Sequence, residues 1–173
     1  MKIYSILILN KAGGLIYQNE ISPGLSKLTA NDYLVLAGTL HGVHAIGSKL
    51  TSTIANPNST TPYKSSTEEF NMQHNAAILA NGKQLGSDSN RSGLKSLETD
   101  LFNLYIFQTV SGLKFILITT SNLDDFQVKS TNELFNLLYV AYTDYVMKNP
   151  FYSLDMPIKC SLFDVRVKEL LKS

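Results

Sequence analysis

Two pairs of apolar segments, each joined by a short break that contains glycine, constrain the fold most strongly. Residues 2–9 and 15–21 are rich in Ile, Leu and Tyr and flank Gly13-Gly14. The pattern returns with aromatic and β-branched residues at 103–110 and 113–120, around a Ser-Gly pair. Because glycine tolerates the positive φ of tight turns, each pair predicts a β-hairpin, the second with a two-residue loop. Hairpin-linked strands predict an antiparallel sheet.

A helix is expected after the first hairpin. Thr29 or Asn31 can cap it, and it would extend to about residue 50. Its apolar stripe comprises Leu36, Leu40, Val43 and Leu50. Gly38 and Gly42 leave a shallow groove along one side, next to His41. Glycine inside a helix costs about 1 kcal/mol relative to alanine, so either another element approaches this groove closely or the helix simply tolerates its glycines.

A second helix is predicted to open at Ser130, because Ser130-Thr131-Asn132-Glu133 fits a capping box, and to run to Lys148 or Asn149 before Pro150. One apolar stripe comprises Leu134, Leu137, Leu138, Ala141, Tyr142, Tyr145 and Val146, while Phe135, Tyr139 and Met147 lie on other faces. A helix that is apolar around most of its circumference must be covered on several sides. This favours a partner surface over complete burial within one small fold.

The segment 151–158, between two prolines, carries aromatic residues, Met and aliphatic residues, types that are enriched in interface cores. The alternative is a chain reversal that packs on its own core. A last helix over 160–171 follows, and its expected inward residues are Leu162, Phe163, Val167, Leu170 and Leu171. Strands and helices in this order indicate an α+β fold.

Between about 51 and 92, Ser, Thr, Asn, Gly and Pro dominate the composition. We interpret this stretch as a polar, flexible insertion in a single domain that covers residues 1–173. Residues 94–101 fit either a strand or a short helix.

Charge and composition exclude several classes of function. There are 15 basic and 14 acidic residues, a net charge of +1, so no basic excess exists to drive nucleic-acid binding. Charged residues make up 17% of the chain, against about 25% in typical domains. The single cysteine, Cys160, fits a reducing compartment. The apolar run at 3–9 is shorter than the about 20 residues of a membrane span, so we expect membrane contact only through a partner.

No constellation of catalytic residues emerges. Gly13-Gly14 lacks the Gly-Lys-Ser/Thr that completes a phosphate loop. His41, His44 and His74 do not form a metal site with Cys160 at a diagnostic spacing. We therefore expect no catalytic residue, no metal and no cofactor. A small enzyme, the rival class, would need a concave site with perturbed titratable groups.

Four segments together resemble the synbindin-type subunits of the TRAPP tethering complex. They are residues 6–17, 40–43, 108–115 and 142–158. The last reads Tyr-Thr-Asp-Tyr-Val-Met-Lys-Asn-Pro-Phe-Tyr-Ser-Leu-Asp-Met-Pro-Ile and is the most specific. The resemblance covers nearly the whole chain except the polar insertion.

The resemblance implies a longin-like, profilin-like fold: a five-stranded antiparallel sheet with one helix on one face and two on the other. It also implies a non-catalytic core subunit of an assembly that is the guanine-nucleotide exchange factor for a Rab/Ypt GTPase in ER-to-Golgi transport. The partners would be other small TRAPP subunits and the GTPase, at cis-Golgi and ER membranes on their cytoplasmic side. The alternative is a longin-type trafficking module of another complex, such as an adaptor light chain or a SNARE-related protein.

The matching C-terminal block is the expected surface for the GTPase or sibling subunits. Its residues are Asp144, Tyr145, Met147, Lys148, Asn149, Pro150, Phe151, Tyr152, Asp155, Met156 and Pro157. A second possible interface is the helix groove at Gly38, His41 and Gly42.

Overall fold

The computed structural model describes residues 1–24, 28–49 and 93–172. The polar insertion predicted at about 51–92 lies outside the described residues, as does Leu50.

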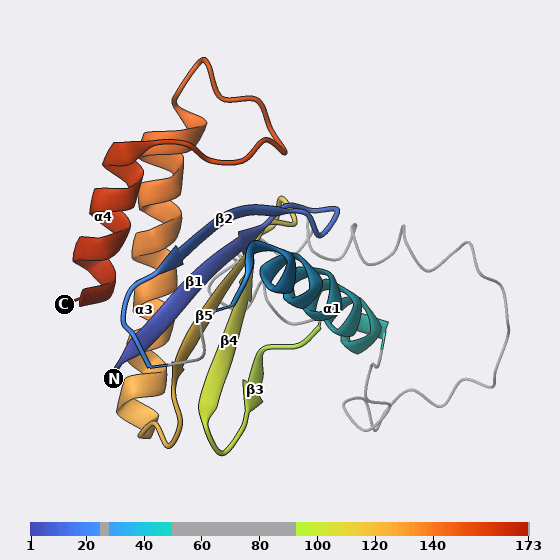
Figure 1. Cartoon of the computed structure of the whole chain (residues 1–173), viewed down its shortest axis with the longest axis vertical. Coiled ribbons are helices and arrows are strands. Elements are labelled where there is room, and N and C mark those ends of the chain that lie inside the picture. The colour runs from blue at the N-terminus through green and yellow to red at the C-terminus, as the bar shows by residue number, and fades with distance from the viewer. Residues whose placement is uncertain (25–27, 50–92, 173) are drawn as a thin grey trace, which may run out of the picture.

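One antiparallel sheet of five strands forms the centre of the described structure (Figure 1). Its strands, in the spatial order β2-β1-β5-β4-β3, are β1 (Ile3–Leu9), β2 (Leu15–Glu20), β3 (Ser96–Glu98), β4 (Phe102–Gln108) and β5 (Lys114–Thr120). Both predicted hairpins are confirmed. The ambiguous segment 94–101 contains a strand, because Ser96–Glu98 pairs with β4.

The loop of the second hairpin is longer than predicted. The Thr109 N–H donates to the Leu113 carbonyl at 2.8 Å, which leaves three residues between them rather than two. The Thr109 hydroxyl also accepts the Leu113 N–H at 3.1 Å and contacts the Ser111 hydroxyl at 2.9 Å. These bonds close the loop around Gly112, whose φ of 90° is easily adopted only by glycine.

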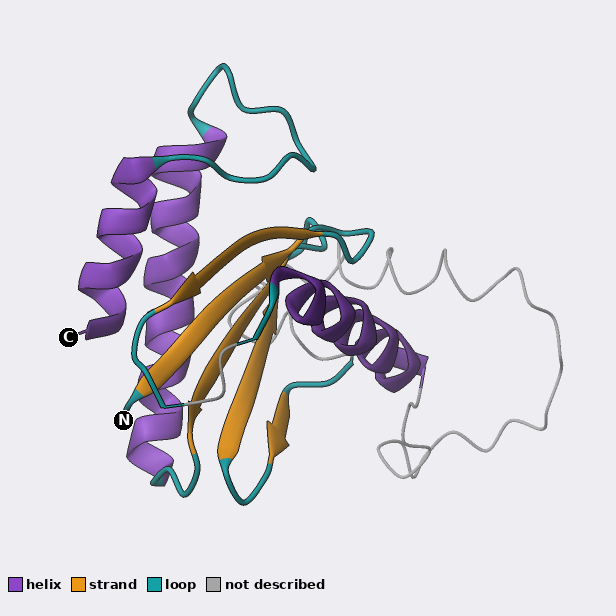
Figure 2. Ribbon diagram, in the orientation of Figure 1, coloured by secondary structure: helices purple, strands orange, loops and turns teal. Residues whose placement is uncertain are grey.

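Helices cover both faces of the sheet, one on one face and two on the other (Figure 2). On the first face lies α1 (Ala30–Lys49). On the second lie α3 (Asp125–Tyr142), its π-helical continuation η3 (Thr143–Met147), and α4 (Ser161–Lys172). The expected α+β, longin-like architecture is confirmed.

Capping explains where α1 begins, whereas α3 begins earlier than predicted. Thr29, just before α1, and Asp32, in its first turn, bond reciprocally, with the Asp32 carboxylate accepting the Thr29 N–H at 2.8 Å. The Ser130 box does not open a helix, since α3 begins five residues earlier at Asp125. The Ser130 hydroxyl instead donates to the Phe126 carbonyl at 3.2 Å, a mid-helix pattern. The acidic side chain of Asp125 in the first turn favours the earlier start.

Two apolar layers form because both faces of the sheet are covered. The layer between the sheet and the α3–α4 pair contains Ile6, Ile8, Phe115, Leu117, Phe135, Leu138, Tyr142, Phe163 and Val167. The layer between the sheet and α1 contains Leu7, Leu9, Ala37, Leu40, Leu104, Ile106, Ile116 and Ile118. Alternate residues of β1 and β5 enter different layers, which explains their uninterrupted hydrophobicity.

The apolar stripes predicted for the helices differ from their buried faces at several positions. Val43 of α1, Leu137 of α3, Tyr145 of η3 and Leu162 of α4 are exposed, whereas Phe135 of α3 is buried. On α4, the buried Phe163 and Val167 set the phase of the inward face, and each residue turns about 100° from its neighbour. Leu162 therefore cannot face inward beside Phe163.

Candidate functional site: a connecting strap and the outer face of a helix

Residues 148–160, which we name the connecting strap, link η3 to α4 and extend beyond the helices (Figure 1). Two short turns shape the strap. The Tyr152 N–H donates to the Asn149 carbonyl at 3.1 Å, and the Met156 N–H donates to the Ser153 carbonyl at 3.2 Å. The Ile158 N–H then donates to the Ile16 carbonyl of β2 at 2.8 Å. The strap is thus fixed to the outer edge of the sheet.

Tyr152 anchors the strap from within. Its half-buried ring packs against the core, and its hydroxyl donates to the Met156 carbonyl at 2.9 Å. The buried Tyr142 hydroxyl donates to the Tyr152 hydroxyl. Burial, with smaller contributions from Tyr152 and the nearby Asp155 carboxylate, raises the pKa of Tyr142 to about 12. Tyr152 thereby differs from the rest of the predicted interface.

The other predicted interface residues of the C-terminal block are exposed. They are Asp144, Tyr145, Met147, Lys148, Asn149, Pro150, Phe151, Asp155, Met156 and Pro157. Phe151 is 95% exposed, and its N–H donates to the Asn149 side-chain oxygen at 3.0 Å. Leu154 and Met156 are also largely exposed. Exposed apolar side chains gathered on one segment typically mark a protein interaction site.

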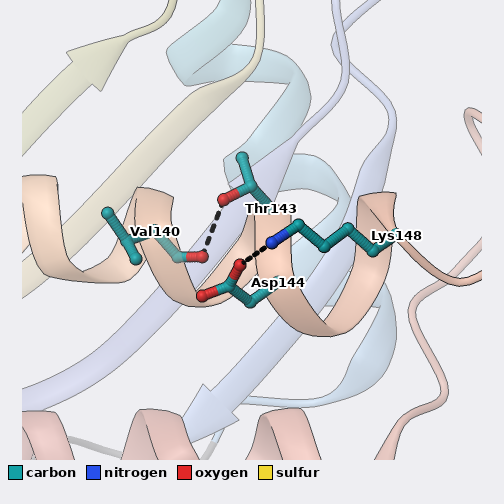
Figure 3. Close-up of polar contacts among 4 residues, drawn as sticks. All are labelled: Val140, Thr143, Asp144 and Lys148. Atoms are coloured by element: carbon teal, nitrogen blue, oxygen red, sulfur yellow. Dashed lines mark hydrogen bonds and ion pairs between the residues drawn. The ribbon is translucent and has the colours of Figure 1, made fainter.

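A widened helical turn precedes the strap. In η3 the Lys148 N–H bonds to the Thr143 carbonyl, five residues back, at 3.1 Å. The Thr143 hydroxyl donates to the Val140 carbonyl at 2.8 Å, and the Lys148 ammonium lies 2.6 Å from the Asp144 carboxylate (Figure 3). Because Asp144 and Lys148 neutralise each other, this end of the helix presents little net charge. π-helical turns occur frequently at functional sites.

The three residues of the predicted groove on α1 do not share one side of the helix. A Cβ atom added at Gly38 or Gly42 would meet nothing within 4 Å, so no described element approaches them. His41 instead faces the β1–β2 turn, where a Cβ on Gly13 would lie 2.5 Å from the imidazole Cγ.

Sequence reasoning missed the aliphatic side chains that surround the two glycines. Exposed aliphatic residues of α1 are Leu34, Val35, Val43 and Ile46. Positions 35, 42 and 46 recur at helical spacing, so the signal was present in the sequence. We name Val35, Gly38, Gly42 and Ile46 the outer face of α1.

Sequence reasoning also missed a polar cluster between α1 and the sheet. His44 is buried between the Leu94 carbonyl, at 3.1 Å, and the Gln108 side chain. Lys114 is buried as well, and its ammonium donates to the Gly112 carbonyl at 3.2 Å. Burial, the Lys114 charge and His44 lower the pKa of His41.

The described residues contain no group of three or more His, Cys, Asp or Glu side chains that could hold a metal ion. His74 lies outside them, and Cys160 is half-buried against the core. In the same ranges, no helix is long and apolar enough to cross a bilayer.

Comparisons with known proteins identify the family of the chain. The Sybindin-like family model matches residues 3–173. "Trafficking protein particle complex subunit 4" of Dictyostelium discoideum is 37% identical over 171 residues, with 99% of this chain and 97% of the relative covered. The proteins of that name in Mus musculus and Homo sapiens are 33% and 32% identical, each with 99% of this chain and 94% of the relative covered. Subunit 1 from Dictyostelium discoideum is 27% identical over 82 residues, 47% of this chain and 55% of the relative. The chain belongs to the Sybindin-like family.

Proposed function

We propose that this chain is a non-catalytic core subunit of a TRAPP complex, which acts as a guanine-nucleotide exchange factor for a Rab/Ypt GTPase in ER-to-Golgi transport. The names of its relatives support membership of the particle. The observation that carries the docking role is the strap, which holds an almost fully exposed aromatic residue, Phe151, on a hydrogen-bonded frame. The chain would work on the cytoplasmic side of cis-Golgi and ER membranes, and it would contact them through the complex.

The mechanism requires no proton transfer or covalent step. An exchange factor accelerates nucleotide release by binding the nucleotide-free state of the GTPase more tightly than the bound state. The chain would contribute a surface of fixed shape, because the Tyr142–Tyr152–Met156 bonds order the strap before a partner arrives. A preordered surface loses less conformational entropy on binding.

The outer face of α1 is the second proposed interface, for a sibling subunit. Val35 and Ile46 are exposed, and the glycines between them leave room for close approach of a second backbone. The match to subunit 1 of Dictyostelium discoideum over part of this chain supports a sibling of similar fold. The α1 face and the α3–α4 side lie on opposite sides of the sheet (Figure 2), so two partners can be bound together.

The test replaces Phe151 with Ala in a reconstituted complex and follows release of labelled GDP. Phe126→Ala is the matched control, because Phe126 is also a largely exposed aromatic residue but lies in the first turn of α3. We expect Phe151→Ala to slow exchange, or weaken assembly, by about tenfold or more, as for an aromatic anchor at an interface centre. Unchanged exchange with intact assembly would refute the role of the strap.

Purification of the native particle tests membership separately. A mass far above 19.2 kDa, with other small TRAPP subunits present, is the expected result. A particle of adaptor or SNARE-related composition would assign the chain to another longin-type module.

A further inference from the structure

Two hairpin turns lie side by side at one end of the sheet, next to α1. The β1–β2 turn follows Leu9 and the β4–β5 turn precedes Lys114, and these two residues are paired in the sheet. Figure 1 shows both turns at the end of the sheet opposite the N-terminus. The helix α1 reaches the same end, because the His41 ring lies against Gly13 of the first turn. Side chains from three separate segments of the chain therefore meet there.

Lys114 brings a buried positive charge to this region. The residue is only 5% exposed, and its ammonium group donates to one acceptor, the Gly112 carbonyl, at 3.2 Å. No carboxylate of the described residues pairs with it, since their ion pairs lie elsewhere, at the end of η3 and within α4. An ammonium group has three N–H donors, so one carbonyl leaves it short of acceptors. Burial lowers the pKa of Lys114, which reflects this missing compensation.

A second polar group in the region lacks a partner. The His41 Nδ1 atom is buried, and it makes no hydrogen bond within the described ranges. The Lys114 charge acts on the His41 ring, so the two side chains lie near each other. The nearby His44 differs, because its two ring nitrogens face the Leu94 carbonyl and the Gln108 side chain. Buried polar groups are normally hydrogen-bonded, so His41 and Lys114 together indicate a missing acceptor.

A third cationic side chain extends over the same turn. Lys11 is exposed, and a Cβ atom added to Gly112 would lie 2.9 Å from its Cγ atom. Lys11 therefore contacts the glycine whose carbonyl accepts from Lys114. The two turns, at 10–14 and 109–113, contain no acidic residue, and neither does α1 beyond Asp32. The region thus combines positive charge with unused donors and has no acid of its own.

We infer that this region binds an acidic side chain of a partner protein, whose carboxylate accepts from Lys11, Lys114 and His41. A carboxylate offers two oxygens with about four lone-pair sites, so one group can accept from several donors. Hydrogen bonds between ionised groups are also the strongest that side chains make. The inference rests on the proposal that the chain acts by docking proteins. It specifies one contact next to the outer face of α1, where Gly42 adjoins His41 in the helix.

The backbone of the two turns favours a carboxylate over a phosphate group. Phosphate sites typically use several free backbone N–H groups. Here the Gly13 N–H donates to the Asn10 carbonyl, and the Gly14 N–H donates to the Asn10 side-chain oxygen. The Gly112 N–H likewise donates to the Thr109 carbonyl. These amides are already used, so side chains supply the donors.

The first test treats the assembled particle with a water-soluble carbodiimide, which joins an ammonium group to a carboxylate in direct contact. We expect a crosslink between Lys11 and an Asp or Glu residue of another subunit. Lys168, an exposed lysine on α4, is the matched control and should give a lower yield. Lys11→Arg should abolish the crosslink and leave the particle mass unchanged, because arginine keeps the charge but does not react. The absence of a product at Lys11, or equal yields at Lys11 and Lys168, would overturn the inference.

The second test uses NMR of the full chain in solution, with N-acetyl-glutamate-N-methylamide as the probe. We expect chemical-shift changes at the Gly112 amide and the His41 ring. The neutral glutamine analogue is the matched ligand control, and equal shifts with it would overturn the inference. A response to inorganic phosphate at a lower concentration would also overturn it, since the site would then be a phosphate site.

Two variants complete the second test. Lys114→Met keeps the unbranched side chain without its charge, and the folded variant should lose the shifts. Lys11→Gln, at an exposed position that does not affect folding, should raise the probe concentration for half the shift about threefold, as for one exposed ion pair. An unchanged concentration in Lys11→Gln would contradict the inference even if Lys114→Met does not fold. Particle mass and GDP release in Phe151→Ala report separately on the proposed function.

Discussion

The hydrogen-bonded pair Tyr142 and Tyr152 determines whether the strap is held in one conformation. Tyr152→Phe removes the hydroxyl that accepts from Tyr142 and donates to the Met156 carbonyl. The Tyr142 hydroxyl is then left without an acceptor in a side chain that is only 1% exposed. The expected loss in the free energy of unfolding is about 2 kcal/mol, dominated by that unsatisfied group.

Tyr142→Phe has a smaller expected effect. The Tyr152 hydroxyl keeps its bond to the Met156 carbonyl, and no buried polar atom loses its partner. The loss is then about 1 kcal/mol, the net value of an ordinary hydrogen bond. The double variant also leaves nothing unsatisfied at Tyr142, so it should cost about 1.5 kcal/mol rather than the sum of about 3 kcal/mol.

Urea unfolding followed by far-UV circular dichroism measures all four proteins of this cycle. Equal m-values would show that the midpoints report stability alone. A double variant whose loss equals the sum of the single losses within about 0.5 kcal/mol would refute the coupling between the two tyrosines.

Two further predictions concern α1 and ionisation. Gly13→Ala should lower the free energy of unfolding by about 1–3 kcal/mol in urea titrations, because φ is 89° and the Cβ would collide with His41. Gly38→Ala should raise it by about 0.5–1 kcal/mol, because the position is helical and a Cβ there meets nothing. Equal effects of the two substitutions would contradict this contrast. Because folding lowers the pKa of His41, the unfolded chain binds a proton at a higher pH than the folded chain does. The urea concentration at the unfolding midpoint should therefore decrease as the pH is lowered below about 6.5, and this decrease should be smaller in His41→Asn. The raised pKa of Tyr142 adds a loss between pH 10 and about 12, absent in Tyr142→Phe. A midpoint independent of pH would contradict both assignments.

The sheet was predictable because its signals are local and redundant. Residues 3–9 and 114–120 form the strands β1 and β5, and their nearly continuous apolar and β-branched composition is typical of buried strands. The Ser130 capping box failed because a four-residue pattern also fits the interior of a helix. There Ser130 and Thr131 donate to carbonyls four residues back, and the acidic first turn at Asp125 decides the start instead.

The sequence marks the block 144–157 as a candidate surface, and its role as an interface stays a prediction. It does not give the direction of each side chain: of two neighbouring aromatic residues, Phe151 points outward and Tyr152 into the core. Sequence periodicity does not apply to an irregular strap, so only the Tyr142 contact distinguishes them. The polar cluster around His44 was missed because strand pairing and helix packing bring His44, Leu94 and Gln108 together from distant parts of the chain.

The exposed apolar side chains on α1 and on the strap account for the low content of charged residues. Charged residues are 17% of the chain, and large aliphatic or aromatic side chains occupy exposed positions on α1 and on the strap. In a free monomer such positions would favour aggregation, and charges would be the usual remedy. Here Val35 and Ile46 lie across the sheet from α3 and α4, which carry the strap, so one core supports two apolar surfaces. A subunit placed between two partners needs this combination, because each surface is desolvated by a different neighbour and charge on either would oppose docking.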